Sequence, residues 1–184
     1  MMMMKILGEG SSFVEDFSGK FVNGTLNWLA FDGDNDNAYL TTFIVSLDLA
    51  TEQYETLMAP VGRRDAGVEF LFSAALKGSL CIVANRHTEA DYWVMKEHGN
   101  ADSWTLLFRI PYCVAGFPQF LRIYTAPVCV SDDGDEVLLE YYLGKFIVYN
   151  SRIVSFKAPG VEVFKGSVLA AGVYAETLMS PTSK

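Results

Sequence analysis

Apolar residues occur along this chain of 184 residues in short runs, and the runs end at Gly, Asn, Asp or Pro. Short runs rich in β-branched and aromatic residues predict strands, whereas an amphipathic helix needs an apolar stripe that repeats every 3.6 residues. No stretch keeps that helical period for longer than two turns, so we expect an all-β chain. The pattern predicts a tight turn that leads into a strand over 22–30. Further strands are expected at 41–49, 53–58, 68–75, 80–85, 92–95, 104–110, 136–142, 145–149, 153–157 and 169–179.

The expected strands fall into repeated units. The phrase apolar-x-Gly-x-Leu occurs around Gly24 and again around Gly78, and a degenerate copy surrounds Gly134. The three glycines are 54 and 56 residues apart, and each is followed by a strand-turn-strand block. A repeat of this length in a β-rich chain indicates stacked antiparallel sheets, such as the blades of a β-propeller. Stacked units of this kind usually present a binding surface and not a single reaction centre.

Two residue types mark key places in the repeat. A glycine such as Gly24 or Gly78 between two strands favours a tight hairpin turn, because glycine adopts a positive φ at no steric cost. Trp28, Trp93 and Trp104 recur in the expected strands. We expect their wide rings to fill the space between tapered blades. Exposed aromatic residues that recognise a partner are the alternative interpretation.

Composition and charge narrow the possible functions. Half of the residues are hydrophobic, which is typical of a globular chain. The net charge of −8 repels phosphate backbones, so we expect no nucleic-acid binding. The three cysteines have no C-x-x-C spacing, and we expect free thiols in a reducing compartment. No signal peptide and no apolar run of the ~18 residues needed for a membrane helix is found, which predicts no membrane association and a cytoplasmic or nuclear location.

The sequence offers no convincing enzyme motif. The two histidines, His87 and His98, do not fall in a zinc-binding spacing. The acidic run that begins at Asp32 starts like a calcium loop but lacks the turn glycine and the final glutamate, so we interpret it as a solvated loop. We therefore expect no catalytic residue, no metal, no cofactor and no enzymatic activity.

A propeller that binds or processes carbohydrate remains the alternative from another functional class. Glycosidases use a pair of carboxylates, and Glu69, Asp91 and Glu140 are candidates. The sequence gives no distance between them. A shortened product without a stable function is a third possibility.

The surface loops carry the remaining functional signal. The segments 62–65, 86–91 and 112–118 join expected strands and would lie at the ends of the blades, where repeat proteins bind their partners. Ordinary solvated loops are the alternative. The residues that we select as candidates for partner binding are Arg63, Arg64, His87, Tyr112 and Phe117.

Several phrases resemble one known family. Residues 93–111 read W-V-M-K-E-H-G-N-A-D-S-W-T-L-L-F-R-I-P, and 21–30, 46–52 and 173–181 carry further matching phrases. Together they resemble the F-box-associated domain of plant F-box proteins, including the F-box/kelch-repeat-like type. On this resemblance the domain covers 16–181, after a loose N-terminal arm at 1–15. Its structural family motif would be Gly24, Trp28, Gly78, Trp93 and Trp104.

The resemblance implies both a fold and a function. The fold would be all-β, with the antiparallel blades of a partial β-propeller, about three blades plus a closing strand near 173–179. The function would be a protein-interaction module, similar to the substrate-recognition domain of an SCF-type ubiquitin ligase receptor. Its partner would be an unidentified protein substrate. In that family an F-box docks the Skp adaptor; these 184 residues contain no F-box phrase, so we assign no Skp-adaptor binding to them.

Overall fold

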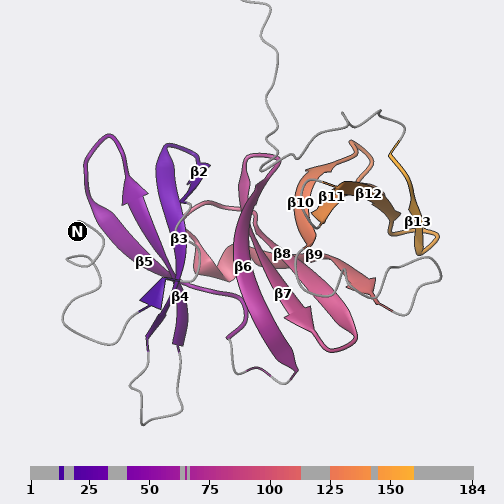
Figure 1. Ribbon diagram of the computed structural model, residues 1–184. Helices are drawn as coiled ribbons and strands as arrows, with labels where there is room; N and C mark the ends of the chain where they lie inside the picture. Colours follow the sequence, from indigo (N-terminus) through magenta and orange to yellow (C-terminus); the bar gives the residue numbers. More distant parts are fainter. Residues whose placement is uncertain are drawn as a thin grey trace, which may run out of the picture.

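The computed structural model describes residues 13–14, 19–32, 41–62, 65, 67–112, 125–141 and 145–159. Within these ranges the chain forms thirteen strands, one short 3-10 helix (Ala101–Ser103) and three antiparallel sheets. Figure 1 shows the sheets side by side in chain order, the first in indigo and purple, the middle in magenta and pink, and the third in orange and yellow. The expected all-β fold is confirmed.

Each sheet is formed by consecutive strands. The first sheet contains β1 (Phe13–Val14), β2 (Lys20–Val22), β3 (Thr25–Asp32), β4 (Thr41–Asp48) and β5 (Tyr54–Met58). The middle sheet contains β6 (Val68–Leu76), β7 (Ser79–Arg86), β8 (Glu89–Met95) and β9 (Trp104–Pro111). The third sheet contains β10 (Thr125–Val130), β11 (Glu136–Tyr141), β12 (Lys145–Asn150) and β13 (Ser155–Lys157). The repeat found in the sequence is therefore one sheet long.

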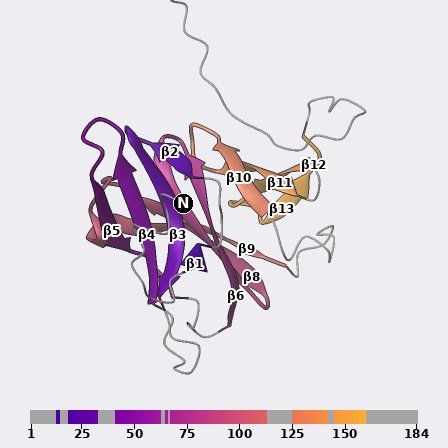
Figure 2. The ribbon, with the colours of Figure 1, turned by 60° about the vertical axis from the view of Figure 1, so that its left-hand side comes forward.

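The sheets are arranged like blades. Most contacts between the backbones of neighbouring sheets join their early strands, β2 to β6 and β6 to β10. Figure 2 shows the same fan of three sheets after rotation. Sheets that meet at their early strands and diverge outward are blades of a partial β-propeller. The closing strand expected at 173–179 lies outside the described residues.

Two apolar cores join the three blades, and the middle sheet contributes to both. Its strand β7 directs Leu80, Ile82 and Ala84 into the core shared with the first sheet. The alternate residues Cys81 and Val83 enter the core shared with the third sheet. All five side chains have no exposed surface. Because a strand buried on both faces needs apolar residues at every position, β7 reads as a continuous apolar run.

Both glycine turns expected from the repeat are present. Asn23 and Gly24 have φ of 49° and 83°, and Lys77 and Gly78 have φ of 49° and 73°. Two successive positive φ values are the signature of a type I′ hairpin, whose twist matches that of the flanking strands. Around Gly134 the hairpin is longer, with the Ser131 amide donating to the Glu136 carbonyl at 2.8 Å. This longer loop is consistent with the degenerate third copy of the phrase.

Replacing Gly78 tests this turn. A Cβ at Gly78 meets no atom within 4 Å, so the cost of a larger residue comes from its φ of 73° alone. We expect Gly78→Ala to lower the free energy of unfolding by about 1–2 kcal/mol. Gly78→Asn should cost less although Asn is larger, because Asn tolerates positive φ. Urea denaturation of both variants measures the order, and an equal or larger loss for Asn would show that crowding limits this position.

The hairpins define two ends of the fan. The turns at 23–24, 77–78 and 131–135 lie at one end, which we call the glycine-turn end; there Lys77 Nζ donates to the Ser131 carbonyl at 2.7 Å. The opposite end, which we call the loop end, carries the strand ends at Asp32, Arg86 and Pro111. In Figure 1 the glycine-turn end is at the top and the loop end at the bottom.

Three local elements differ from the expectation. Phe13 and Val14 pair with β3, so two residues of the expected loose arm belong to the sheet, while the domain boundaries themselves stay a prediction. The strand expected from 153 begins only at Ser155, because Asn150 Oδ1 accepts the amides of residues 152 and 153 and holds a turn. The loop at 96–102 contains the 3-10 helix, and Asn100 Oδ1 accepts the Asp102 amide at its start. No helix of the described residues is long and apolar enough to cross a membrane.

Candidate functional site

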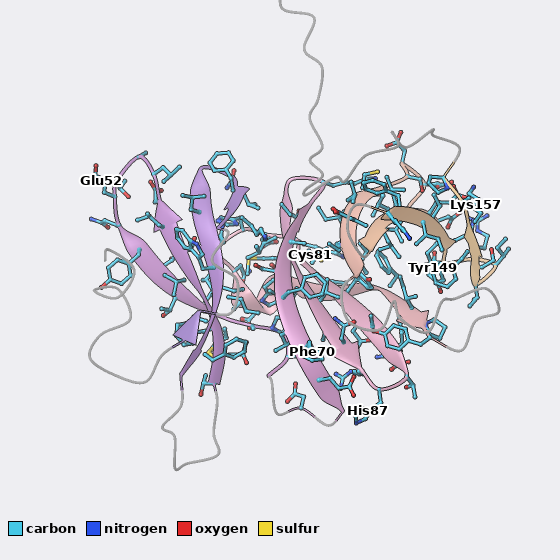
Figure 3. The ribbon with its side chains drawn as sticks, viewed as in Figure 1. Glu52, Phe70, Cys81, His87, Tyr149 and Lys157 are labelled. Atoms are coloured by element: carbon cyan, nitrogen blue, oxygen red, sulfur yellow. The ribbon has the colours of Figure 1, made fainter. Side chains whose placement is uncertain are left out.

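The loop end of the middle sheet brings together several segments singled out in the sequence. The register pairs Val68 with Arg86 and Glu89 with Pro111, so the ends of all four strands meet there. His87 is exposed in the β7–β8 turn, and its Nδ1 contacts Glu69 Oε1 on β6. Figure 3 shows His87 at the lower tip of this sheet. A polar side chain that projects from a turn can contact a partner without any rearrangement of the sheet.

Tyr112, the second described candidate, is placed differently. Its side chain is only 7% exposed and lies in the core between the middle and third sheets. Its hydroxyl donates to Asn85 Oδ1 at 2.5 Å, and its amide donates to the Thr88 carbonyl at 2.8 Å. Tyr112 thus holds the β7–β8 turn from its buried side. A partner at the loop end would contact the turn itself and not the buried Tyr112 side chain. Its direct role in binding stays a prediction.

The other three candidates, Arg63, Arg64 and Phe117, lie outside the described residues. The structure neither joins them to His87 nor separates them from it. Their roles in partner binding stay predictions.

A buried charge cluster lies beside His87. The Asp91 side chain is 1% exposed and accepts from Arg86 Nε at 3.0 Å. Arg109 also binds this carboxylate, through Nε at 2.5 Å and Nη2 at 3.2 Å. The hydrogen bond to Asp91 raises the pKa of Arg109. Since two guanidinium groups occupy its oxygens, Asp91 is held as a structural anion at the base of the loop end.

Sequence reasoning considered Asp91 only as one of several glycosidase carboxylates, and it missed both arginines. A signal was present, because Asp91 interrupts an otherwise apolar strand. An aspartate at a core position usually has a cationic partner. The register then pairs it with Arg109 across the sheet, which cannot be read from the sequence.

Two of the three tryptophans of the family motif lie at the contact between the first and middle sheets. Trp93 and Trp104 are half-buried and pack against the core between the first and middle sheets. Trp104 Nε1 also donates to the Met58 carbonyl at 3.0 Å, which links β9 to β5. Trp28 is half-buried, and a Cβ added at Gly19 would stand 2.7 Å from its indole ring. Their family role, like that of Gly24 and Gly78 in the turns, stays a prediction.

Reactive chemistry is limited in the part of the chain that the structure describes. Cys81 and Cys129 are free thiols, and burial strongly raises the pKa of the Cys81 thiol, so it remains protonated. Figure 3 shows Cys81 and Tyr149 inside the body formed by the middle and third sheets. Among the described residues, no three His, Cys, Asp or Glu side chains gather as metal ligands.

Comparison with known proteins identifies the family of this partial propeller. The chain is 35% identical over 167 residues to an F-box/kelch-repeat protein of Arabidopsis thaliana, a match that covers 89% of this chain and 41% of that protein. It is 32% identical over 111 residues to the F-box protein CPR1 of the same plant, covering 58% of the chain and 26% of CPR1. A third F-box protein of A. thaliana is 29% identical over 129 residues, covering 66% of the chain and 29% of that protein. No protein-family model matches.

These similarities and the all-β blades lead to one conclusion. The chain carries a domain of the F-box-associated type, as the phrase at 93–111 indicated. It spans less than half of the length of each of these relatives. Their names describe F-box and kelch-repeat proteins and do not describe enzymes.

Proposed function

We propose that this chain is a protein-interaction module that holds a protein substrate at the loop end of its blades. The observation that carries the proposal is the 35% identity to an F-box/kelch-repeat protein over 89% of the chain. F-box proteins with repeat domains bring a protein substrate to a ubiquitin ligase, and this domain type would supply the substrate contact. The net charge of −8 further favours a protein partner over a nucleic acid.

The structure supports the loop end as the contact surface. The Asp91 cluster and Tyr112 hold the base of the β7–β8 turn, and His87 projects beyond them. A rigid base with a projecting polar residue is how scaffolds usually present binding loops. Transfer of ubiquitin would need an adaptor contact, which we do not propose for these residues. A cytoplasmic or nuclear place of action is part of the proposal.

Quantitative affinity capture from plant cells tests the proposal. The bait is the full chain, either unchanged, as His87→Ala, or as the control Arg152→Ala. Like His87, Arg152 is an exposed basic side chain in a turn and contacts a carboxylate, that of Asp135, but it lies in the third sheet. We expect a protein that the unchanged chain and the control retain, and that binds the purified His87→Ala chain about tenfold more weakly.

The same experiment can contradict the proposal. The proposal is contradicted if calorimetry shows that the captured protein binds His87→Ala and the unchanged chain with equal affinity. Binding that Arg152→Ala reduces as strongly as His87→Ala would place the contact elsewhere on the fan.

A further inference from the structure

A polar cavity of about 340 Å³ lies at the glycine-turn end, between the first sheet and the loop after β8. Its floor is the face of the first sheet that turns toward the middle sheet. The register pairs Thr25 with Asp48 and Ser46 with Glu55, so these four residues share that face. His98 and Gly99, from the loop after β8, close the other side. The cavity is thus built by two blades and lies at the end opposite to His87.

The hydrogen bonds of Thr25 determine which atom donates in its contact with His98. Thr25 Oγ1 donates its only proton to the Val22 carbonyl at 2.8 Å, and it accepts from Asn27 Nδ2 at 2.9 Å. Thr25 Oγ1 can therefore only accept a hydrogen bond from His98 Nε2, which lies 2.9 Å away, so Nε2 carries a proton. In the neutral imidazole ring the other nitrogen, Nδ1, is then a hydrogen-bond acceptor.

Three buried polar atoms at this place have no hydrogen-bond partner among the described residues. They are His98 Nδ1, Ser46 Oγ and Asn27 Oδ1. Ser46 lines the cavity and is 1% exposed. Buried polar groups are nearly always paired, and an unpaired group costs free energy. Asn27 is not one of the residues that line the cavity, but Ser46 and His98 are. The Nδ1 atom of a neutral His98 ring accepts and the Ser46 hydroxyl can accept, so a hydrogen-bond donor in the cavity suits both.

The charges around the cavity select the kind of donor. Asp48 and Glu55 line it, and neither lysine nor arginine is among the described residues that do so. The amides of Ala50 and Thr51 donate to Asp48 Oδ1 at 2.8 Å, and these hydrogen bonds lower the pKa of Asp48. These bonds favour the charged form of Asp48, the carboxylate at this side of the cavity.

We propose that this inter-blade cavity binds a cationic hydrogen-bond donor, namely the guanidinium or ammonium group of an arginine or lysine side chain. The cation would lie between Asp48 and Glu55 and donate to Ser46 Oγ and His98 Nδ1. Guanidinium presents several donors in one plane, which suits acceptors that converge from two blades. The cavity lies at the end of the blades opposite to the loop end, so this proposal does not depend on the proposed function.

Titration of the purified chain with small probes tests the site. The probes are Nα-acetyl-arginine methylamide, the matching citrulline compound, which keeps the shape but lacks the charge, and the guanidinium ion, all at constant ionic strength. We expect the arginine compound to bind about tenfold more tightly than the citrulline compound. It should shift the backbone amide NMR signals of Ser46 and Gly99. Guanidinium that binds as tightly as the arginine compound would show that a free cation suffices, and weaker guanidinium binding would show that the site reads an amino-acid side chain.

Two variants localise the binding. Glu55→Gln removes one charge from an exposed position of the edge strand β5, where little loss of stability is expected, and it should weaken arginine binding about tenfold. The control Glu52→Gln removes the same charge from the neighbouring exposed turn and should leave binding unchanged. Figure 3 shows Glu52 at the tip of the first sheet. The proposal is overturned by equal affinity for arginine and citrulline, by binding that survives Glu55→Gln, or by no saturable binding at about 10 mM, in which case water alone fills the cavity.

Discussion

Asp91→Ala is expected to lower the free energy of unfolding by about 3 kcal/mol, which is a large part of the stability of a domain of this kind. The substitution removes the anion that Arg86 and Arg109 share. Breaking a buried ion pair typically costs about 3–5 kcal/mol, because the remaining charge is left without a partner. The lower value applies here because the Arg109 side chain is 49% exposed and regains water, whereas that of Arg86 is only 21% exposed.

Urea denaturation followed by far-UV circular dichroism measures this loss. Glu89→Gln is the matched control, since Glu89 also pairs with Arg109, at 3.2 Å, but is 26% exposed. Partly exposed ion pairs contribute about 0–1 kcal/mol, so the control should remain close to the unchanged chain. A loss for Asp91→Ala no larger than that for Glu89→Gln would show that the cluster is hydrated and that it does not hold the loop end.

The second large effect is expected at the middle blade. Ile82→Ala should cost about 3 kcal/mol, because Ile82 is fully buried in the core between the first and middle sheets. Val83→Ala removes fewer atoms and should cost less, but it acts on the opposite core, toward the third sheet. Because β7 belongs to both cores, each variant should shift one common unfolding transition of all three sheets.

Native-state hydrogen exchange checks that coupling. The strongest protection in β4 and in β11 should fall by the same amount in each variant. If Ile82→Ala lowered protection only in the first sheet and Val83→Ala only in the third, the blades would unfold independently, and the middle sheet would not unite them.

The turns and the order of the strands could be predicted from the sequence because they depend on local properties. Asn23 and Gly24 between two apolar runs define a hairpin before any tertiary contact is known. The continuous apolar run of β7 similarly indicates a strand that is buried on both faces. Such signals locate the blades, and the repeat spacing then gives their number.

The candidate site was less predictable because it depends on register and burial. Tyr112 resembled an exposed interface residue, yet Phe108, Ile110 and Tyr112 alternate along β9 and beyond its end, and all three enter the same core. Counting every second residue past the end of the strand would have placed it inside. The arginine partners of Asp91 and the cavity between two blades need the tertiary structure, since their residues come from separate strands or sheets.

Site-specific photo-crosslinking in plant cells is the most direct test of the central claim that the loop end holds a protein substrate. A benzophenone side chain replaces His87 in one version of the full chain and Arg152 in the other. We predict that position 87 crosslinks to a defined protein and that position 152, at the glycine-turn end of the third sheet, does not. Absence of any adduct from position 87, or the same adduct from both positions, would contradict the claim.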